Sequence, residues 1–199
     1  MKAIVWLASY PKSGNTWIRF LLANALGTSA HPIDVDRLQF APNAARRALM
    51  DQTSVIESSE LTAPELAACR RETFRCFART LSPIPFFKVH EQWHVAADGA
   101  PLFPTDCTRR VVYIVRHPLD VAVSLAHHSG IPVSEAARIM CQSGYVANLS
   151  RRGIHPQVPQ LYGSWSEHVR SWLDDARLPV SLVRFEDLLE DTERALATL

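Results

Sequence analysis

The fold is decided by the stretch Ile4-Val5-Trp6-Leu7-Ala8-Ser9-Tyr10-Pro11-Lys12-Ser13-Gly14-Asn15-Thr16-Trp17. Its apolar first half, with two β-branched residues, predicts a buried strand. The proline and the small polar residues that follow predict a turn. Apolar residues then recur at helical spacing until Gly27, a residue type that commonly ends helices. The order is therefore strand, small-residue loop and helix.

This order of elements favours binding of an anion at the loop. The first amides of a helix lack partners within the helix, and the helix dipole favours negative charge there. Lys12 adds a cation, and Ser13 and Thr16 add hydroxyl donors. The loop is not a Walker A sequence, because Lys12 precedes Gly14 instead of following it. From the loop alone, a phosphate cradle and an ordinary strand-to-helix turn both stay open.

The composition indicates one globular domain without a strong electrostatic bias. A chain of 199 residues is long enough for one sizeable core and short for two. The net charge of +1 provides no global attraction to nucleic acid or to an anionic membrane. No apolar run has the length of a membrane span or the form of a secretory signal. We therefore expect a cytoplasmic protein with reduced cysteines, no nucleic-acid partner and no membrane association.

The remaining chain alternates between strand and helix patterns, which predicts an α/β domain with a mostly parallel central sheet. Strands are expected at 86–90, 111–115 and 179–184, and a charged turn at 106–110. Helices are expected at 44–52, 62–81, 118–129, 134–149 and from 164, with a final one running from about 185 to 199. Residues 150–163 are expected to form a mobile surface loop. Capping boxes at Thr62 and Ser164 support two of the helix starts.

Three chemically active side chains follow predicted strands. Lys12, His90 and Arg116 each stand at or just after the carboxyl end of one. Ligands of parallel α/β sheets bind at these ends. We therefore expect the three side chains to surround one ligand.

Five segments, in order, resemble motifs of the sulfotransferase family. They are Tyr10–Trp17, close to the family's Y-P-K-S-G-T-T-W; Phe87–His90, close to K-T-H; Arg116–Ser124, close to R-N-P-K-D-x-x-x-S; Gly163–Trp172, matching G-S-W-x-x-H-V-x-x-W; and Phe185–Leu188, close to Y-E-D-L. Each motif alone is weak, but their shared order over nearly the whole chain is specific.

The resemblance implies a P-loop-like three-layer α/β fold and 3′-phosphoadenosine 5′-phosphosulfate as the cofactor. It implies transfer of a sulfuryl group to a hydroxyl or amine of a small-molecule acceptor, without a metal. His90 is then the general base, a role suited to imidazole near neutral pH. Lys12 and Lys88 stabilise developing charge. The implied cofactor-binding residues are Lys12, Ser13, Gly14, Asn15 and Thr16 at the 5′-phosphate, Trp17 at the adenine, and Arg116 and Ser124 at the 3′-phosphate.

The chain departs from the family pattern in several places. Asn15 replaces a threonine, Phe185 replaces a tyrosine, and Glu91-Gln92 replace Leu-Pro after His90. The family's later R-K-G-x-x-G segment, which helps to hold the 3′-phosphate in relatives, does not occur. We therefore expect residues 1–199 to be a single sulfotransferase domain that is truncated at its C-terminus. The acceptor pocket is expected from residues 28–82 and 150–163.

Three alternatives stay open. The chain could be a non-catalytic nucleotide-binding relative; a P-loop kinase is less favoured, because no Walker A sequence is present. His90-Glu91-Gln92-Trp93-His94 also matches the H-E-x-x-H helix of zinc peptidases. That chemistry requires both histidines on one helical face and the glutamate as base. On this reasoning Glu91→Gln abolishes a peptidase and barely affects a sulfotransferase.

Overall fold

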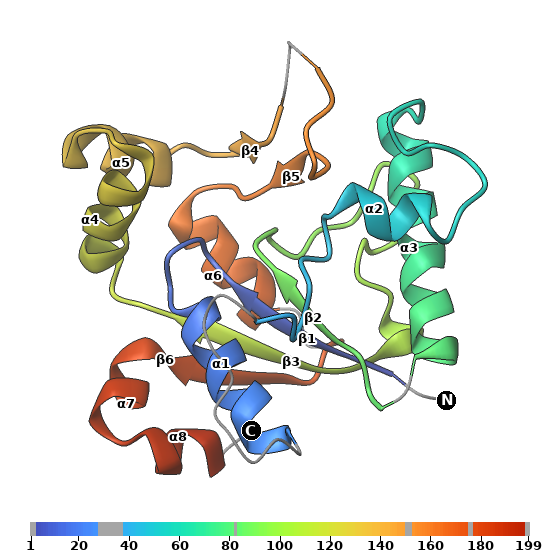
Figure 1. Ribbon diagram of the computed structural model, residues 1–199. Helices are drawn as coiled ribbons and strands as arrows, with labels where there is room; N and C mark the ends of the chain where they lie inside the picture. The colour runs from blue at the N-terminus through green and yellow to red at the C-terminus, as the bar shows by residue number, and fades with distance from the viewer. Residues whose placement is uncertain (1–2, 28–37, 82, 150–152, 175–176, 198–199) are drawn as a thin grey trace.

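A parallel sheet of four strands forms the centre of the molecule. The computed structural model describes residues 3–27, 38–81, 83–149, 153–174 and 177–197. In this part of the chain the strand order is β2 (Phe86–Val89), β1 (Ile4–Ser9), β3 (Thr108–Val115) and β6 (Val180–Arg184). Each neighbouring pair runs parallel, as Figure 1 shows. The predicted mostly parallel α/β sheet is confirmed.

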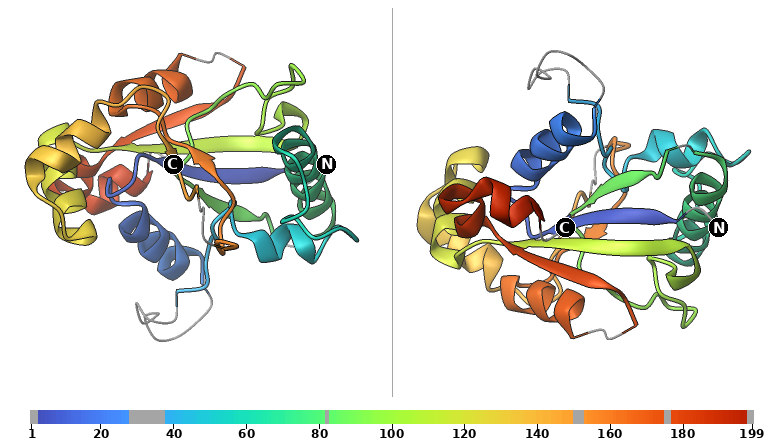
Figure 2. Two further views of the ribbon diagram at one scale, coloured as in Figure 1. Left: turned by 90° about the horizontal axis from the view of Figure 1, so that it is seen from above. Right: turned by 90° about the horizontal axis from the view of Figure 1, so that it is seen from below.

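Helices cover both faces of the sheet, which gives three layers. Alternate residues of β1 point to opposite sides, because successive side chains of a strand alternate. Trp6 packs with Phe74 of α3 (Ala63–Thr80) and Trp172 of α6 (Trp165–Leu173). Leu7 packs on the other face with Ile18 of α1 (Asn15–Leu26). Figure 2 shows α1 and α6 on opposite sides of the sheet. The three-layer architecture that the sequence suggested is therefore present.

Smaller elements surround the carboxyl ends of the strands. They are α4 (Pro118–Ser129), α5 (Val133–Met140), the antiparallel pair β4 (Val146–Ala147) and β5 (Gln160–Leu161), and α7 (Phe185–Glu190). The short α2 (Arg47–Asp51) lies within the expected helix at 44–52. The 3₁₀ turn η2 (Thr105–Cys107) precedes β3, and α8 (Thr192–Ala197) follows α7. The described helices are all too short or too polar to cross a lipid bilayer.

Two predicted boundaries around the β4–β5 pair were wrong. The helix expected at 134–149 ends at Met140. Gly144 then adopts a positive φ of 63°, and Glu167 accepts hydrogen bonds from the Ser143 hydroxyl and the Gly144 amide. The surface loop expected at 150–163 was wrong for its described part, residues 153–163. Val158 is fully buried and β5 belongs to this segment.

The expected final helix is two helices. Asp191, with φ −150°, separates α7 from α8 and accepts a hydrogen bond from the Arg194 amide at 3.0 Å. Asp191 therefore caps the start of α8. The backbone turns at this residue, although the apolar pattern of the sequence continues through it. The charged turn expected at 106–110 is shorter than predicted, because β3 already begins at Thr108. The capping boxes at Thr62 and Ser164 are both confirmed.

Candidate active site

The loop after β1 is shaped by two residues with positive φ. Lys12 has a φ of 69° and Gly14 has a φ of 97°. A β-carbon on Gly14 would lie 2.3 Å from the Phe185 ring, so both the backbone angle and the space require glycine there. Non-glycine residues seldom adopt positive φ, and such strained positions cluster at functional sites. The turn directs the start of α1 toward the carboxyl end of the sheet.

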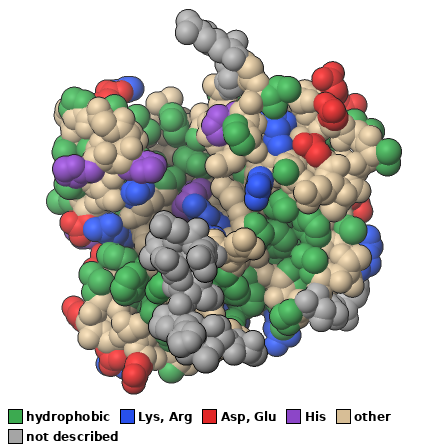
Figure 3. All heavy atoms as spheres, in the orientation of Figure 1, with side chains coloured by type: hydrophobic (Ala, Val, Ile, Leu, Met, Phe, Trp, Pro, Cys, Tyr) green, Lys and Arg blue, Asp and Glu red, His purple; other side chains and the backbone are tan. Residues whose placement is uncertain are grey.

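A cavity of about 840 Å³ opens at this end of the sheet. Of the ten different residues proposed for catalysis or cofactor binding, nine line it: Lys12, Gly14, Asn15, Thr16, Trp17, Lys88, His90, Arg116 and Ser124. Figure 3 shows Lys, Arg and His side chains gathered in the central hollow of this face. The structure thus brings Lys12, His90 and Arg116 to one cavity, as predicted from their positions at the ends of strands.

Ser13 and Asn15 do not offer their side chains to the cavity in the expected way. Ser13 is buried and does not line the cavity, and its hydroxyl has no partner among the described residues. Asn15 donates through Nδ2 to the Leu7 carbonyl at 2.8 Å and to Ser9 Oγ at 3.2 Å. Its side chain therefore fastens α1 to β1. A ligand in the loop would meet the backbone amide of Asn15.

The site nevertheless has donors without acceptors, which suits an anion. The first turn of α1 has no side-chain cap and no acidic residue. Arg116 lies over the Phe185 ring at 4.6 Å and donates through Nη1 to the Lys12 carbonyl at 3.2 Å. Its Nε is buried and unpaired within the described chain. Free amides, Lys12 and an incompletely satisfied guanidinium are the donors that phosphate groups require.

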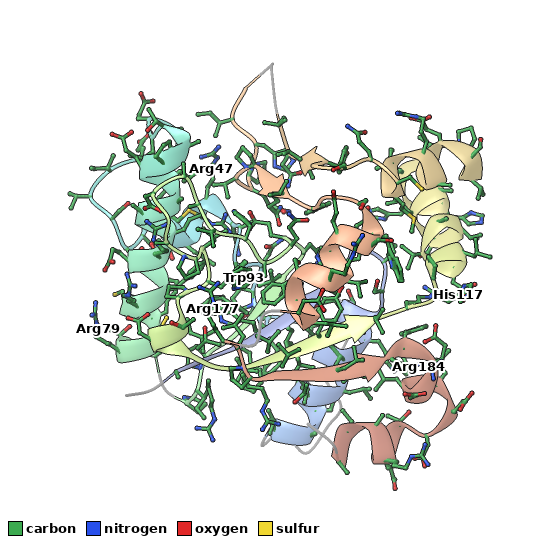
Figure 4. All side chains as sticks on the ribbon, turned by 180° about the vertical axis from the view of Figure 1, so that it is seen from behind. Arg47, Arg79, Trp93, His117, Arg177 and Arg184 are labelled. Atoms are coloured by element: carbon green, nitrogen blue, oxygen red, sulfur yellow. The ribbon has the colours of Figure 1, made fainter. Side chains whose placement is uncertain are left out.

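The element after β6 supports the Arg116 side of the site. Figure 4 shows His117 and Arg184 close to the carboxyl ends of β3 and β6. The His117 amide donates to the Glu186 carboxylate at 2.9 Å, which joins the start of α4 to α7. Phe185, at the start of α7, lies between Gly14 and Arg116. Phenylalanine in place of the family's tyrosine therefore keeps the ring that orients Arg116.

His90 is held in the form that can accept a proton at Nε2. Its Nδ1 lies 2.9 Å from the Ser9 carbonyl. A carbonyl oxygen only accepts hydrogen bonds, so Nδ1 carries the proton and Nε2 carries the lone pair. Burial, followed by the positive charge of Lys88, lowers the pKa of His90 well below its usual range. The imidazole is therefore neutral at physiological pH.

A second histidine holds the backbone of His90. His168 lies at 3.1 Å through Nε2 from the His90 carbonyl and at 2.8 Å through Nδ1 from the Tyr113 hydroxyl. Because the carbonyl only accepts, Nε2 donates to it and Nδ1 accepts from Tyr113. Burial lowers the pKa of His168 to about 3, so this chain of hydrogen bonds is uncharged. No role had been predicted for His168 or Tyr113.

Lys88 lies in the wall of the cavity as a weakened cation. Burial, and then the charges of Arg19 and Lys12, lower the pKa of Lys88 to about 8. The ammonium group is thus still mostly protonated at neutral pH, but it has little water around it. An anion beside it would be bound more strongly than at an exposed lysine, because the local dielectric constant is low.

Glu91 excludes the zinc-peptidase interpretation. Residues 90–94 form no helix, so His90 and His94 do not share a helical face. Glu91 is buried and accepts hydrogen bonds from both terminal nitrogens of Arg70. Trp172 donates to the Glu91 carbonyl at 3.0 Å. Glu91 therefore supports the segment after β2 and cannot act as a base on a ligand in the cavity.

The part of the cavity wall expected to form the acceptor pocket was only partly predicted. Asn43, Gln157 and Tyr162 line the cavity from the two regions expected to build the acceptor pocket. Tyr145 lines it from 134–149, where a helix was expected. Residues 28–37, 82 and 150–152 of the expected regions lie outside the described chain. A turn after α5 carries no motif, so the sequence offered no signal for Tyr145.

One family model matches this chain over nearly its whole length. The model described as "Sulfotransferase domain" covers residues 2–199. Human sulfotransferase 1E1 is 24% identical over 196 residues, and bovine sulfotransferase 1A1 is 26% identical over 191. The matches cover 97% and 96% of this chain, but only 56% and 55% of the relatives. The chain thus spans about half the length of these curated relatives.

Solved structures show the same fold. Mouse sulfotransferase SULT7A1 complexed with PAP matches with a TM-score of 0.55 and 19% identity, over 100% of this chain and 57% of that one. Retinol dehydratase in complex with androsterone and inactive cofactor PAP gives a TM-score of 0.54 and 21% identity, over 98% and 57%. At these identities the likeness shows the fold alone.

Proposed function

Because this chain belongs to the sulfotransferase family, we propose that it transfers a sulfuryl group from 3′-phosphoadenosine 5′-phosphosulfate to a hydroxyl or amine of a small-molecule acceptor. The observation that carries this proposal is the meeting of Lys12, His90 and Arg116 around one cavity. Two cations there suit a doubly phosphorylated donor, and a neutral imidazole suits deprotonation of an acceptor.

The donor nucleotide fits the residues that are present. PAP, the 3′-phosphoadenosine 5′-phosphate left after transfer, is the molecule named in the two solved relatives. We assign its 5′-phosphate to Lys12, Thr16 and the amides at the start of α1, since no side chain caps this end of the helix. Its 3′-phosphate is assigned to Arg116, whose Nε is unpaired, and to Ser124 of α4. Trp17, 45% exposed at the cavity, offers a face for the adenine.

When bound, the nucleotide supplies an activated sulfuryl group. His90 takes the proton of the acceptor at Nε2, because Nδ1–H is held by the Ser9 carbonyl. Lys12 stabilises negative charge that forms on the leaving phosphate, and Lys88 stabilises charge on the sulfuryl oxygens. The low pKa of His90 favours the neutral base before binding. The negative charge of a bound nucleotide raises this pKa toward the range in which an imidazole accepts a proton efficiently.

The test separates binding of the nucleotide from transfer. His90→Ala should retain affinity for 3′-phosphoadenosine 5′-phosphate, measured by calorimetry, and lose sulfuryl transfer across a panel of phenols, alcohols and amines. His94→Ala is the matched control, because His94 lies four residues away and does not line the cavity. Transfer that survives in His90→Ala would overturn the role of His90. Nucleotide binding by the wild type without transfer to any acceptor would favour the non-catalytic alternative.

A further inference from the structure

An aromatic wall leads away from His90 along the β4–β5 pair. The ring of Tyr162 lies 6.4 Å from that of His90, and the ring of Tyr145 lies 6.3 Å from that of Tyr162. Both tyrosines line the cavity. Aromatic rings next to the proposed base favour a flat, apolar acceptor body beside them.

A cluster of side-chain amides stands on the Lys88 side of the same cavity. Asn43 belongs to this cluster. The next residue, Ala44, links it to β2, because the Ala44 amide donates to the Lys88 carbonyl at 2.9 Å. Three amide groups converge on Oε1 of Gln157: Asn43 Nδ2 at 3.0 Å, Gln160 Nε2 at 2.9 Å and Asn148 Nδ2 at 3.5 Å. Asn43, Asn148 and Gln157 all line the cavity.

The orientation of the Gln157 amide follows from a backbone hydrogen bond. The Ala45 amide can only donate, and it lies 2.9 Å from Oδ1 of Asn43. Asn43 therefore donates to Gln157 through its NH₂ group, and the side-chain oxygen of Gln157 accepts this hydrogen bond. The NH₂ group of Gln157 is then turned away from the cluster. Within the described chain no residue accepts a hydrogen bond from it, so it is available to a ligand.

The backbone around Gln157 is held rigidly. The Arg47 amide donates to the Pro156 carbonyl at 3.0 Å, and the Val158 amide donates to the Ala45 carbonyl at 2.9 Å. Arg47, labelled in Figure 4, also donates through Nε to the His155 carbonyl at 2.9 Å. Val158 is fully buried beside Ala45 and Met50. A recognition group fixed in this way loses little entropy when it binds a ligand.

We propose that Gln157 selects acceptors that carry a hydrogen-bond-accepting oxygen, such as a carbonyl, at a distance from the hydroxyl that is sulfated. This inference rests on the proposed function and names its substrate class. The aromatic wall holds the ring, His90 meets the hydroxyl, and the NH₂ group of Gln157 meets the second oxygen. No acidic side chain is among the described residues that line the cavity. The site therefore favours neutral hydroxyl compounds over cationic amines.

The test uses matched ligand pairs that differ by one carbonyl. The pairs are para-hydroxyacetophenone with para-ethylphenol, and para-hydroxybenzophenone with para-benzylphenol. Each is titrated calorimetrically into the protein with and without 3′-phosphoadenosine 5′-phosphate. A neutral hydrogen bond makes the ketone of at least one pair bind about fivefold more tightly to the wild type.

Three variants assign that preference to Gln157. Gln157→Met should abolish it. Gln157→Glu keeps an oxygen for the three amide donors and places the other carboxylate oxygen where NH₂ stood, so it should disfavour the ketones. Gln160→Met is the matched control, because Gln160 donates to the same oxygen, is buried and does not line the cavity. Gln160→Met should keep the preference.

The titrations and the variants can overturn the role of Gln157. A wild type that binds ketone and methylene partners equally, or a preference that persists in Gln157→Met and Gln157→Glu, overturns the assignment. Failure of the nucleotide to bind would instead contradict the proposed function. The titrations without nucleotide still report the ketone preference in that case.

Discussion

Glu91→Gln should strongly destabilise the protein, although it leaves the cavity lining unchanged. Arg70 and Glu91 have side chains only 4% and 3% exposed, and they form a bidentate ion pair between α3 and the segment after β2. Glutamine neutralises one partner and leaves the guanidinium charged in the core. Breaking a buried pair in this way costs about 3–5 kcal/mol. For a chain of this size that corresponds to a fall in Tm of about 6–20 °C.

Calorimetric melting measures this loss of stability. Two further variants serve as controls. Glu72→Gln breaks an ion pair with Arg75 in which Glu72 is 67% exposed, so it should cost less than about 1 kcal/mol. Replacing both buried partners, in Arg70→Met with Glu91→Leu, should recover most of the lost stability, because no unpaired charge remains. A Glu91→Gln protein that melts within about 2 °C of the wild type would refute the reasoning. The expectation from sequence concerned activity alone; the buried ion pair adds a large cost in stability.

Three further predictions follow from the site and its support. Gly14→Ala should lower both Tm and affinity for 3′-phosphoadenosine 5′-phosphate, because φ is 97° and the new methyl meets Phe185; unchanged melting and affinity would contradict the loop geometry. Binding of the same nucleotide should raise the pKa of His90 in an NMR titration, since its negative charge opposes that of Lys88; a pKa that is unchanged or falls would remove the nucleotide from its neighbourhood. The free energy of unfolding should decrease as pH falls from about 6.5 toward 3, by up to about 1.4 kcal/mol per pH unit from His168. The sign follows because the unfolded chain binds a proton on this histidine that the folded chain excludes. Urea titrations at several pH values should show that the free energy of unfolding depends less steeply on pH in His168→Gln. An equal pH dependence would contradict the assignment to His168.

The sequence predicted the elements that present the site because each has a strong local signal. Short apolar runs, rich in β-branched residues in β1, β3 and β6, predicted the four parallel strands, and the capping boxes predicted the starts of α3 and α6. Parallel strands bring their carboxyl ends to one edge, so the meeting of Lys12, His90 and Arg116 could be inferred without coordinates. These predictions depend on spacing and topology, which one sequence carries.

The remaining features depend on partners distant in the chain. Arg70 lies in the helix expected at 62–81 and had no predicted role, and only its contact with Glu91 explains why both are buried. The helix expected at 134–149 ends early because Glu167, beyond the turn, binds Ser143 and Gly144. On the acceptor side, the orientation of the Gln157 amide could not be predicted from nearby residues. It is fixed by Asn43, more than a hundred residues earlier in the chain.

The central claim is that Lys12, His90 and Arg116 enclose a doubly phosphorylated nucleotide. It is tested most directly by comparing the affinities of the wild type and of Arg116→Ala for 3′-phosphoadenosine 5′-phosphosulfate and for adenosine 5′-phosphosulfate, which lacks the 3′-phosphate. We expect the wild type to prefer the 3′-phosphorylated nucleotide about ten- to a hundredfold, as a charged hydrogen bond provides, and Arg116→Ala to lose that preference. Equal affinities in the wild type, or a ratio unchanged by the substitution, would contradict the account.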